Sequence, residues 1–590
     1  MPAKKLLIEQ WLPIEAIGAE CMRERGASSA LPPLYFLHVW WARHPLTVSR
    51  AAILASLLPA YPSDEDPGAR PWPDRFLSIF PAFDRYQDWF LELIGIMGDP
   101  VASRKIIDWA KIRGIKLTPK IISALPTDWT QKLPNDMGVS IPYGYPRAFT
   151  VNPTEEQLSL LYDLLEWTWG TREITFCDPM SGGGSIPFEA LRYGLTVHAN
   201  ELNPVASVIL KATLDYPARF GPSLVEDIRK YGRAWCERVR QRLDPFFPLA
   251  SPNENIFCYL WARTVACPET GKPVPLSPNW WLRKGSDPIA VRVIADSKES
   301  RCLFEIVRGN TACKKANPDK GTVKRGTGIS PWTGDAIDGD YIKAEAQSGQ
   351  MGQQLYAVGV KRPGELSFRA PTEADEAAFR IAESESRRQF PKWESRGLLP
   401  TEARREGRAD WSCEIYGLKT WAHAFSKRQL LANCTAVEEL IRIADSEIDG
   451  LDAARTEAVV VCLALAYDKA INYNSNHCFW DYTRSKIAHA FSRHDFAFRF
   501  SSSEFDAARN LIPWCVDQVE DAFLQIAKLS AGPGTILGAD EPGRARVLNI
   551  TKGAAQSLSK INDGSLCSIT VDPPYYDNVM YAELSNYFYV

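Results

Sequence analysis

The feature that most constrains the fold is an alternation of strand-like and helix-like segments between residues 174 and 214. Residues 174–177 and 195–201 are apolar runs typical of buried strands, and residues 185–193 and 204–214 have helical periodicity. Strands that alternate with helices form a parallel sheet with crossover helices. Strand-like runs return at residues 546–550 and 568–571, so the sequence predicts one doubly wound α/β sheet that a large insertion splits.

The composition of the 590 residues is that of a globular protein without a strong global charge. The formal net charge is −3, which gives no overall field that would attract nucleic acid. The 13 cysteines are scattered without a C-x-x-C pair, as expected for reduced thiols. No apolar run approaches the roughly 20 residues of a membrane span. We therefore expect a cytoplasmic protein that does not insert into a membrane.

Four regions follow from these patterns. Residues 1–150 read as mostly helical, and residues 151–220 form the first half of the sheet. Residues 221–540 are the insertion, with a ribbon-like part at about 255–375, a helical part after it and a possible role in DNA recognition. Residues 541–590 supply the second half of the sheet.

A glycine-rich motif follows the first strand of the sheet. It reads Asp178-Pro179-Met180-Ser181-Gly182-Gly183-Gly184-Ser185. Glycines at a strand-to-helix turn let the backbone approach a ligand closely. The spacing is not that of a phosphate-binding loop. Asp178 would repel an anion but attract an ammonium group.

A carboxylate, Glu201, ends the second strand about 20 residues after the glycines. An acid at this place in such a sheet accepts the two hydroxyls of an adenosine ribose. S-adenosyl-L-methionine matches both motifs, because it is a nucleoside with a zwitterionic tail and without a pyrophosphate. The sequence therefore predicts this cofactor, with Asp178 and Glu201 in its site.

A second motif, Asp572-Pro573-Pro574-Tyr575, ends the strand at residues 568–571. The two prolines cannot donate hydrogen bonds, so the Asp572 carboxylate and a main-chain carbonyl are left as acceptors for an amino group. Tyr575 offers a ring on which an extruded base can stack. This pattern predicts a site for the exocyclic amine of a nucleic-acid base.

Together these motifs resemble the prokaryotic adenine-specific DNA methylases that carry a zinc-ribbon insertion, some of which are encoded beside anti-phage defence genes. The resemblance covers most of the chain. It rests on His38-Val39-Trp40-Trp41-Ala42-Arg43-His44-Pro45-Leu46, on the glycine motif with Glu201-Leu202-Asn203-Pro204, and on the stretch from Asp572 to Val579.

The resemblance implies a Rossmann-like methyltransferase sheet that acts on adenine N6 in double-stranded DNA, in DNA modification or phage defence. It assigns the cofactor site to Asp178, Pro179, Gly182, Gly183, Gly184, Glu201 and Asn203. It assigns Asp572, Pro573, Pro574 and Tyr575 to catalysis, with Asp572 and the Pro573 carbonyl orienting the amine.

The sequence departs from this family in two places. The paired Cys-Pro-x-Cys-Gly knuckles, which hold zinc, read Cys267-Pro268-Glu269-Thr270-Gly271 and Ser330-Pro331-Trp332-Thr333-Gly334. One of four sulfurs remains, so we expect a ribbon without metal. The chain also ends at Val590, fifteen residues after Tyr575. We therefore expect further strands to be missing or to come from another polypeptide.

Two alternatives remain open at this point. An Asp-Pro-Pro-Tyr turn would also accept cytosine N4 or an amino group of an RNA base. The second alternative is a non-catalytic DNA-binding or assembly subunit with a degenerate methyltransferase core. The lost zinc ligands, Ala554 in place of an acid or small polar residue, and the early chain end favour it.

Overall fold

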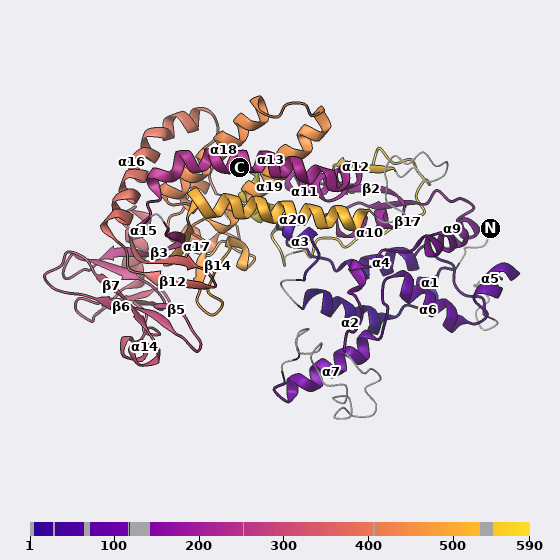
Figure 1. Ribbon diagram of the computed structural model, residues 1–590, viewed down its shortest axis with the longest axis horizontal. Coiled ribbons are helices and arrows are strands. Elements are labelled where there is room, and N and C mark those ends of the chain that lie inside the picture. Colours follow the sequence, from indigo (N-terminus) through magenta and orange to yellow (C-terminus); the bar gives the residue numbers. More distant parts are fainter. Residues whose placement is uncertain are drawn as a thin grey trace. The chain divides into compact units, whose positions relative to one another are not determined.

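The computed structural model describes residues 5–26, 30–63, 71–115, 117, 142–251, 253–404, 407–531, 547–576 and 578–590. The protein is mixed α/β, with a helical N-terminal part and several sheets, which confirms the broad fold class expected from the sequence (Figure 1). The chain divides into two compact units. Unit 1 is Met1–Val225 with Asp521–Tyr575, and unit 2 is Glu226–Glu520 with Tyr576–Val590.

The helices of unit 1 precede the first strand of its sheet or connect its strands. They are α1 (Leu7–Gln10), α2 (Ile14–Arg25), α3 (Leu34–Leu37), α4 (Leu46–Ala55), α5 (Asp74–Ile79), α6 (Phe83–Leu93), α7 (Pro100–Ile112), α9 (Glu155–Trp169), α10 (Ser185–Arg192), α11 (Pro204–Leu210) and α12 (Tyr216–Phe220). Helix α9 begins after the cap residue Thr154, which exchanges hydrogen bonds with Gln157, and it ends at Gly170.

The sheet of unit 1 has four parallel strands in the order β16-β2-β1-β17. Their bounds are β1 (Thr175–Asp178), β2 (Thr196–Glu201), β16 (Leu548–Lys552) and β17 (Ser568–Ile569). Cys177 of β1 is in register with His198 of β2 and with Ile569 of β17. β1 and β2 therefore form one sheet with β16 and β17, which follow much later in the sequence. The carboxyl ends of these parallel strands meet at one edge of the sheet.

Two elements differ from the sequence expectation at their ends. The helix expected to run to Leu214 changes after Leu210 into one π-helical turn, Lys211–Asp215. The strand expected at residues 568–571 is short, although Thr570 still donates a hydrogen bond to the Cys177 carbonyl at 3.2 Å. The prolines that follow cannot donate to a ladder, so strand pairing ends there.

A buried network of two arginines and one carboxylate joins α4 to α10. Nε of Arg50 donates to Glu189 at 2.8 Å, and Arg192 donates to the other oxygen of Glu189 at 2.7 Å. All three side chains are buried. Arg50 also donates to the carbonyls of Ile94 and Ala148. This network fixes the helical N-terminal part against the sheet.

We predict that Glu189→Gln lowers the free energy of unfolding by about 3–5 kcal/mol, because it leaves two buried guanidinium groups without a counter-charge. Denaturant unfolding of the purified chain measures this loss. The matched control is Glu166→Gln, which breaks the exposed ion pair with Arg172. The control change should stay within about 1 kcal/mol. Equal effects of the two substitutions would contradict the structural role of the network.

Unit 2 is built around an antiparallel sheet in the order β12-β11-β3-β15, with β4 also paired to β3. A three-stranded sheet β5-β6-β7, a second one β10-β9-β8 and the hairpin β13-β14 accompany it. The strands are β3 (Asn255–Ala266), β4 (Pro273–Leu276), β5 (Trp281–Arg283), β6 (Ile289–Ile294), β7 (Leu303–Arg308), β8 (Val323–Lys324), β9 (Thr327–Ile329), β10 (Ala336–Ile337), β11 (Gly352–Arg362), β12 (Glu365–Arg369), β13 (Phe479–Asp481), β14 (Lys486–Ala488) and β15 (Ser501–Phe505).

The helices of unit 2 include the longest that the structure describes. They are α14 (Asn310–Ala316), α15 (Gly339–Gln347), α16 (Glu373–Ser395), α17 (Trp411–Ile415), α18 (Lys427–Ser446), α19 (Ala453–Tyr473) and α21 (Tyr581–Tyr589). Two boundaries between the units fall within α13 (Leu224–Leu243) and α20 (Ile512–Ser530), and the third lies between Tyr575 and Tyr576. Among the helices that the structure describes, none is long and apolar enough to cross a membrane.

Candidate active site

The glycine motif forms the turn from β1 into α10, as the sequence predicts. Gly182 and Gly184 have φ values of +52° and +89°, which residues with a side chain rarely adopt. A Cβ atom on Gly184 would lie 3.1 Å from the Leu210 side chain. Glycine is therefore required here both by the backbone conformation and by the close approach of α11.

Asp178 ends β1 and its side chain is buried. One carboxylate oxygen accepts a hydrogen bond from the Met180 amide at 3.1 Å. The other oxygen is buried and has no hydrogen-bond partner in the structure. Burial, followed by the negative charges of Glu201 and Asp572, raises the pKa of Asp178 to about 7, and the hydrogen bond from Met180 opposes this shift. A buried acceptor without a partner is costly, so this oxygen suits a cationic donor from a ligand.

Glu201 ends β2 and holds two loops in place. Its Oε2 accepts a hydrogen bond from the Gly182 amide at 2.7 Å. Its Oε1 accepts from the amides of Leu202 and Asn203. Asn203 in turn caps α11 by accepting from Val205 and Ala206. Oε1 thus accepts two hydrogen bonds already, whereas Oε2 accepts one and keeps a lone pair for a hydroxyl. The expected contact with a ribose stays a prediction.

Asp572 follows β17, next to the strand that carries Asp178. Its Oδ2 lies 2.6 Å from Nδ1 of His44 and accepts a hydrogen bond from the Tyr575 hydroxyl at 2.8 Å. Burial lowers the pKa of His44, although the Asp572 charge opposes this shift. The neutral imidazole with its proton on Nδ1 therefore donates to Asp572 at neutral pH.

The remaining residues of this motif are largely open to solvent. Pro573 and Pro574 are exposed, and Tyr575 is 50% exposed. Its ring is accessible, and the hydrogen bond with Asp572 raises the pKa of its hydroxyl. Asp577, which belongs to the stretch similar to the methylase family, lies outside the described residues.

Trp40 lies against the glycine turn. A Cβ atom added to Gly182 would lie 2.6 Å from Nε1 of Trp40, and one added to Gly183 would lie 3.2 Å from its Cβ. The segment from Trp40 to His44 thus touches the loop after β1 and also the loop after β17. The N-terminal part supplies one wall of the candidate site.

Two residues of the site were missed by the sequence reasoning. The Asn200 amide donates to the carbonyls of Pro179 and Gly553, and its oxygen accepts from Thr551, so it ties β2 to β16 and to the loops after β1 and β16. His44 was noted only as part of a motif. No local pattern marks either residue, because each acts on segments far away in the sequence.

Comparisons with known proteins give one match. The model of a family described as a protein of unknown function, DUF1156, matches residues 11–76. This stretch includes Trp40 and His44. No curated protein and no solved structure matches the chain.

The two turns at the positions of the zinc knuckles lie next to each other in unit 2. Gly271 donates to the Cys267 carbonyl at 2.8 Å, and Gly334 donates to the Ser330 carbonyl at 2.9 Å. Sγ of Cys267 lies 3.3 Å from Oγ of Ser330. Burial opposes ionisation of Cys267, but hydrogen bonds from Ser330 and Thr270 outweigh it and lower its pKa. Within the described ranges, no group of three or more potential ligands could hold a metal ion.

We predict that the triple substitution Thr270→Cys, Ser330→Cys and Thr333→Cys creates a zinc site, because it supplies the four thiolates of a closed tetrahedral centre. Cobalt titration should give the absorption of a thiolate-bound metal at one ion per chain. The unchanged chain should give none. The control is Ser330→Cys alone, which supplies two thiolates and should bind far more weakly. Stoichiometric zinc in the unchanged chain would contradict the prediction.

Proposed function

We propose that this protein is an S-adenosyl-L-methionine-dependent methyltransferase that modifies adenine N6 in double-stranded DNA. The strand order supports a Rossmann-like methyltransferase sheet. By position in the chain, the strands lie in the order third, second, first and fourth, as in the first four strands of a doubly wound fold. Ligands of such sheets bind at the carboxyl ends of the strands, where both motifs lie.

The observation that carries this proposal is the unpartnered, buried oxygen of Asp178 beside two further carboxylates. Asp178 and Glu201 end β1 and β2, and Asp572 follows β17, the strand on the other side of β1. This cluster disfavours a phosphate ligand and favours a cation. S-adenosyl-L-methionine has a sulfonium and an ammonium group against one carboxylate, so its net charge is complementary.

The residues of the site fit this cofactor. Asp178 would hold the ammonium group, the glycine turn would admit the amino-acid tail, and Oε2 of Glu201 would accept a ribose hydroxyl. Asn203 and Pro179 shape the same loops through backbone contacts. When bound, the cofactor supplies an electrophilic methyl group on sulfur.

The motif Asp572-Pro573-Pro574-Tyr575 supplies hydrogen-bond acceptors for the amine of the base. The Asp572 carboxylate and the Pro573 carbonyl accept its two N–H bonds, which turns the nitrogen lone pair toward the cofactor site. Asp572 is also placed to take the proton that the nitrogen releases. The exposed ring of Tyr575 supports a stacked base. The choice of adenine N6 and of duplex DNA rests on the resemblance to the DNA methylases.

His44 acts as a positioning residue in this scheme. Its 2.6 Å contact holds the Asp572 carboxylate in one rotamer. Trp40, from the same segment, backs the glycine turn. The N-terminal segment that matches DUF1156 therefore contributes to both halves of the proposed site.

We predict that Asp572→Asn lowers the rate of methyl transfer to duplex DNA roughly 100-fold or more, because one acceptor of the amine becomes a donor. Labelled cofactor measures the rate, and mass spectrometry of the digested DNA identifies N6-methyladenine. The matched control is Asp563→Asn, an exposed acid in the same segment. N4-methylcytosine as the product would overturn the choice of base. Binding of the cofactor without any transfer would favour the assembly-subunit reading.

A second arm of this experiment separates positioning by His44 from a structural role. His44→Leu should lower kcat about tenfold or more, since it removes a hydrogen bond to a charged group. His44→Asn, which keeps a donor near the Nδ1 position, should recover most of the rate. The KM for the cofactor should not change in either variant.

We predict that affinity for S-adenosyl-L-methionine falls as pH falls. The pKa of Asp178 is raised to about 7, so the carboxylate that binds the ammonium group is present above this pH and lost below it. The dissociation constant should rise about tenfold between pH 8 and pH 6. Calorimetry measures it. Asp178→Asn should bind weakly at both pH values, and an unchanged pH dependence in that variant would contradict the assignment.

A further inference from the structure

The last residue of α2, Arg25, lies beside the candidate active site. The hydrogen bond to Asp572 raises the pKa of the Tyr575 hydroxyl, and the positive charge of Arg25 opposes this shift, so the guanidinium lies near this hydroxyl. Arg25 is exposed and forms no ion pair among the residues that the structure describes. Helix α2 and the motif that ends at Tyr575 belong to one compact unit. The charge of Arg25 is therefore available to a ligand of this site.

Hydrogen bonds of the preceding residue fix the end of α2 next to the segment that carries His44. Glu24 is buried, and its carboxylate accepts from the Leu46 amide at 2.8 Å and from the hydroxyl of the next residue at 2.9 Å. Leu46 begins α4, two residues after His44, whose Nδ1 lies 2.6 Å from Asp572. These contacts place Arg25 close to the motif without any appeal to its charge.

A second arginine adds positive charge near Arg25. The Tyr35 hydroxyl donates to the His44 carbonyl at 2.7 Å. The guanidinium of Arg43 lies over the Tyr35 ring, 5.6 Å from its centroid. Burial raises the pKa of Tyr35, and the charges of both arginines oppose this shift. Both guanidinium groups therefore lie near Tyr35, next to the residue that binds Asp572.

A DNA strand brings negative charge to an edge of the sheet that is itself negative. Asp178, Glu201 and Asp572 stand at this edge, and they repel the phosphates of a strand. A base that is stacked on Tyr575 stays attached to its phosphate through one sugar, so the phosphate lies in the surroundings of the ring. An arginine beside the ring offsets the repulsion and binds a phosphate through two N–H donors.

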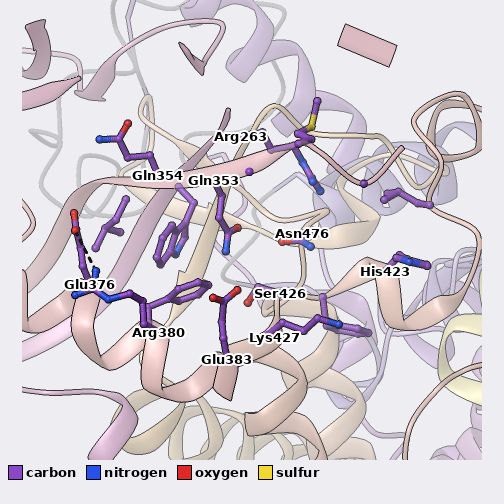
Figure 2. Close-up of a pocket in the computed structure, with 18 of the residues that line it drawn as sticks. Arg263, Gln353, Gln354, Glu376, Arg380, Glu383, His423, Ser426, Lys427 and Asn476 are labelled. Atoms are coloured by element: carbon purple, nitrogen blue, oxygen red, sulfur yellow. Dashed lines mark ion pairs between the residues drawn. The ribbon is translucent and has the colours of Figure 1, made fainter. Parts of the chain in front are cut away.

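A cavity of about 620 Å³ in unit 2 also contains cations, but they do not meet at one place (Figure 2). Figure 2 shows Asn476 and Ser426 between Arg263 and Lys427. Burial lowers the pKa of Lys427, and the carboxylate of Glu383 in the same lining opposes this shift. The exposed guanidinium at the end of α2 is therefore a better match for a phosphate than this cavity.

We propose that Arg25 binds the phosphate of the nucleotide whose base stacks on Tyr575. Phosphate contacts of this kind fix the position of a nucleic-acid strand on a protein. The contact holds the extruded nucleotide while Asp572 accepts a hydrogen bond from its amine. This inference rests on the proposed function, because it takes the base on Tyr575 from it. It also gives a role to the segment that matches DUF1156, which contains Arg25.

The test is binding of the full chain to a fluorescein-labelled DNA duplex that carries one mismatched adenine, since a mismatched base is extruded more easily than a paired one. Fluorescence anisotropy measures the dissociation constant over a range of salt concentrations. Arg25→Gln should weaken binding about tenfold at low salt and lower the slope of affinity against salt by about one, because one phosphate contact is lost. Arg25→Lys, which keeps the charge, should recover the slope and part of the affinity. Arg85→Gln, which removes an exposed charge on α6, should change neither.

A double-substitution cycle with Tyr575→Ala determines whether both residues hold the same nucleotide. Tyr575→Ala should weaken binding without changing the salt slope, and Arg25→Gln should then have a smaller effect than in the unchanged chain. The inference is overturned if the unchanged chain does not bind the duplex, or if Arg25→Gln has no larger effect than Arg85→Gln. Binding that depends on Arg25 without any methyl transfer would support the contact and contradict the proposed activity.

Discussion

The buried contact between Arg50 and Glu189 is the interaction on which the candidate active site depends. Arg50 is the fifth residue of α4, and Glu189 is the fifth residue of α10. The ion pair therefore lies one turn inside each helix and brings their starts together. The segment with Trp40 and His44 precedes α4, and the glycine turn precedes α10. A single desolvated pair thus sets the distance between a segment of the N-terminal helical part and a loop of the sheet.

The candidate active site concentrates negative charge at one edge of the sheet. Asp178, Glu201 and Asp572 lie close enough for the latter two to raise the pKa of the first. Backbone amides compensate Glu201, and His44 with Tyr575 compensates Asp572. Asp178 retains a buried oxygen that has no hydrogen-bond partner among the described residues. The electrostatic balance of the unliganded site is therefore incomplete in a way that a cationic ligand completes.

Unit 2 contains a buried ion pair whose charges are balanced. Arg428 pairs with Glu504, and a hydrogen bond from Trp261 to Glu504 keeps the indole in place. Arg428 donates to both oxygens of Glu504 and to the Phe246 carbonyl, so this buried pair contributes rigidity.

The sequence predicts those residues of the site that a pattern of neighbouring residues marks. Asp178, the glycines, Glu201 and Asp572 each stand at the end of an apolar strand, and adjacent parallel strands bring such ends together. Asn200 could not be found in this way, because it bonds to Gly553, 353 residues away. His44 has no pattern of its own, and it reaches Asp572 only because Arg50 and Glu189 fix α4 on α10. Residues that act across a split sheet are visible only once the packing between its distant segments is known.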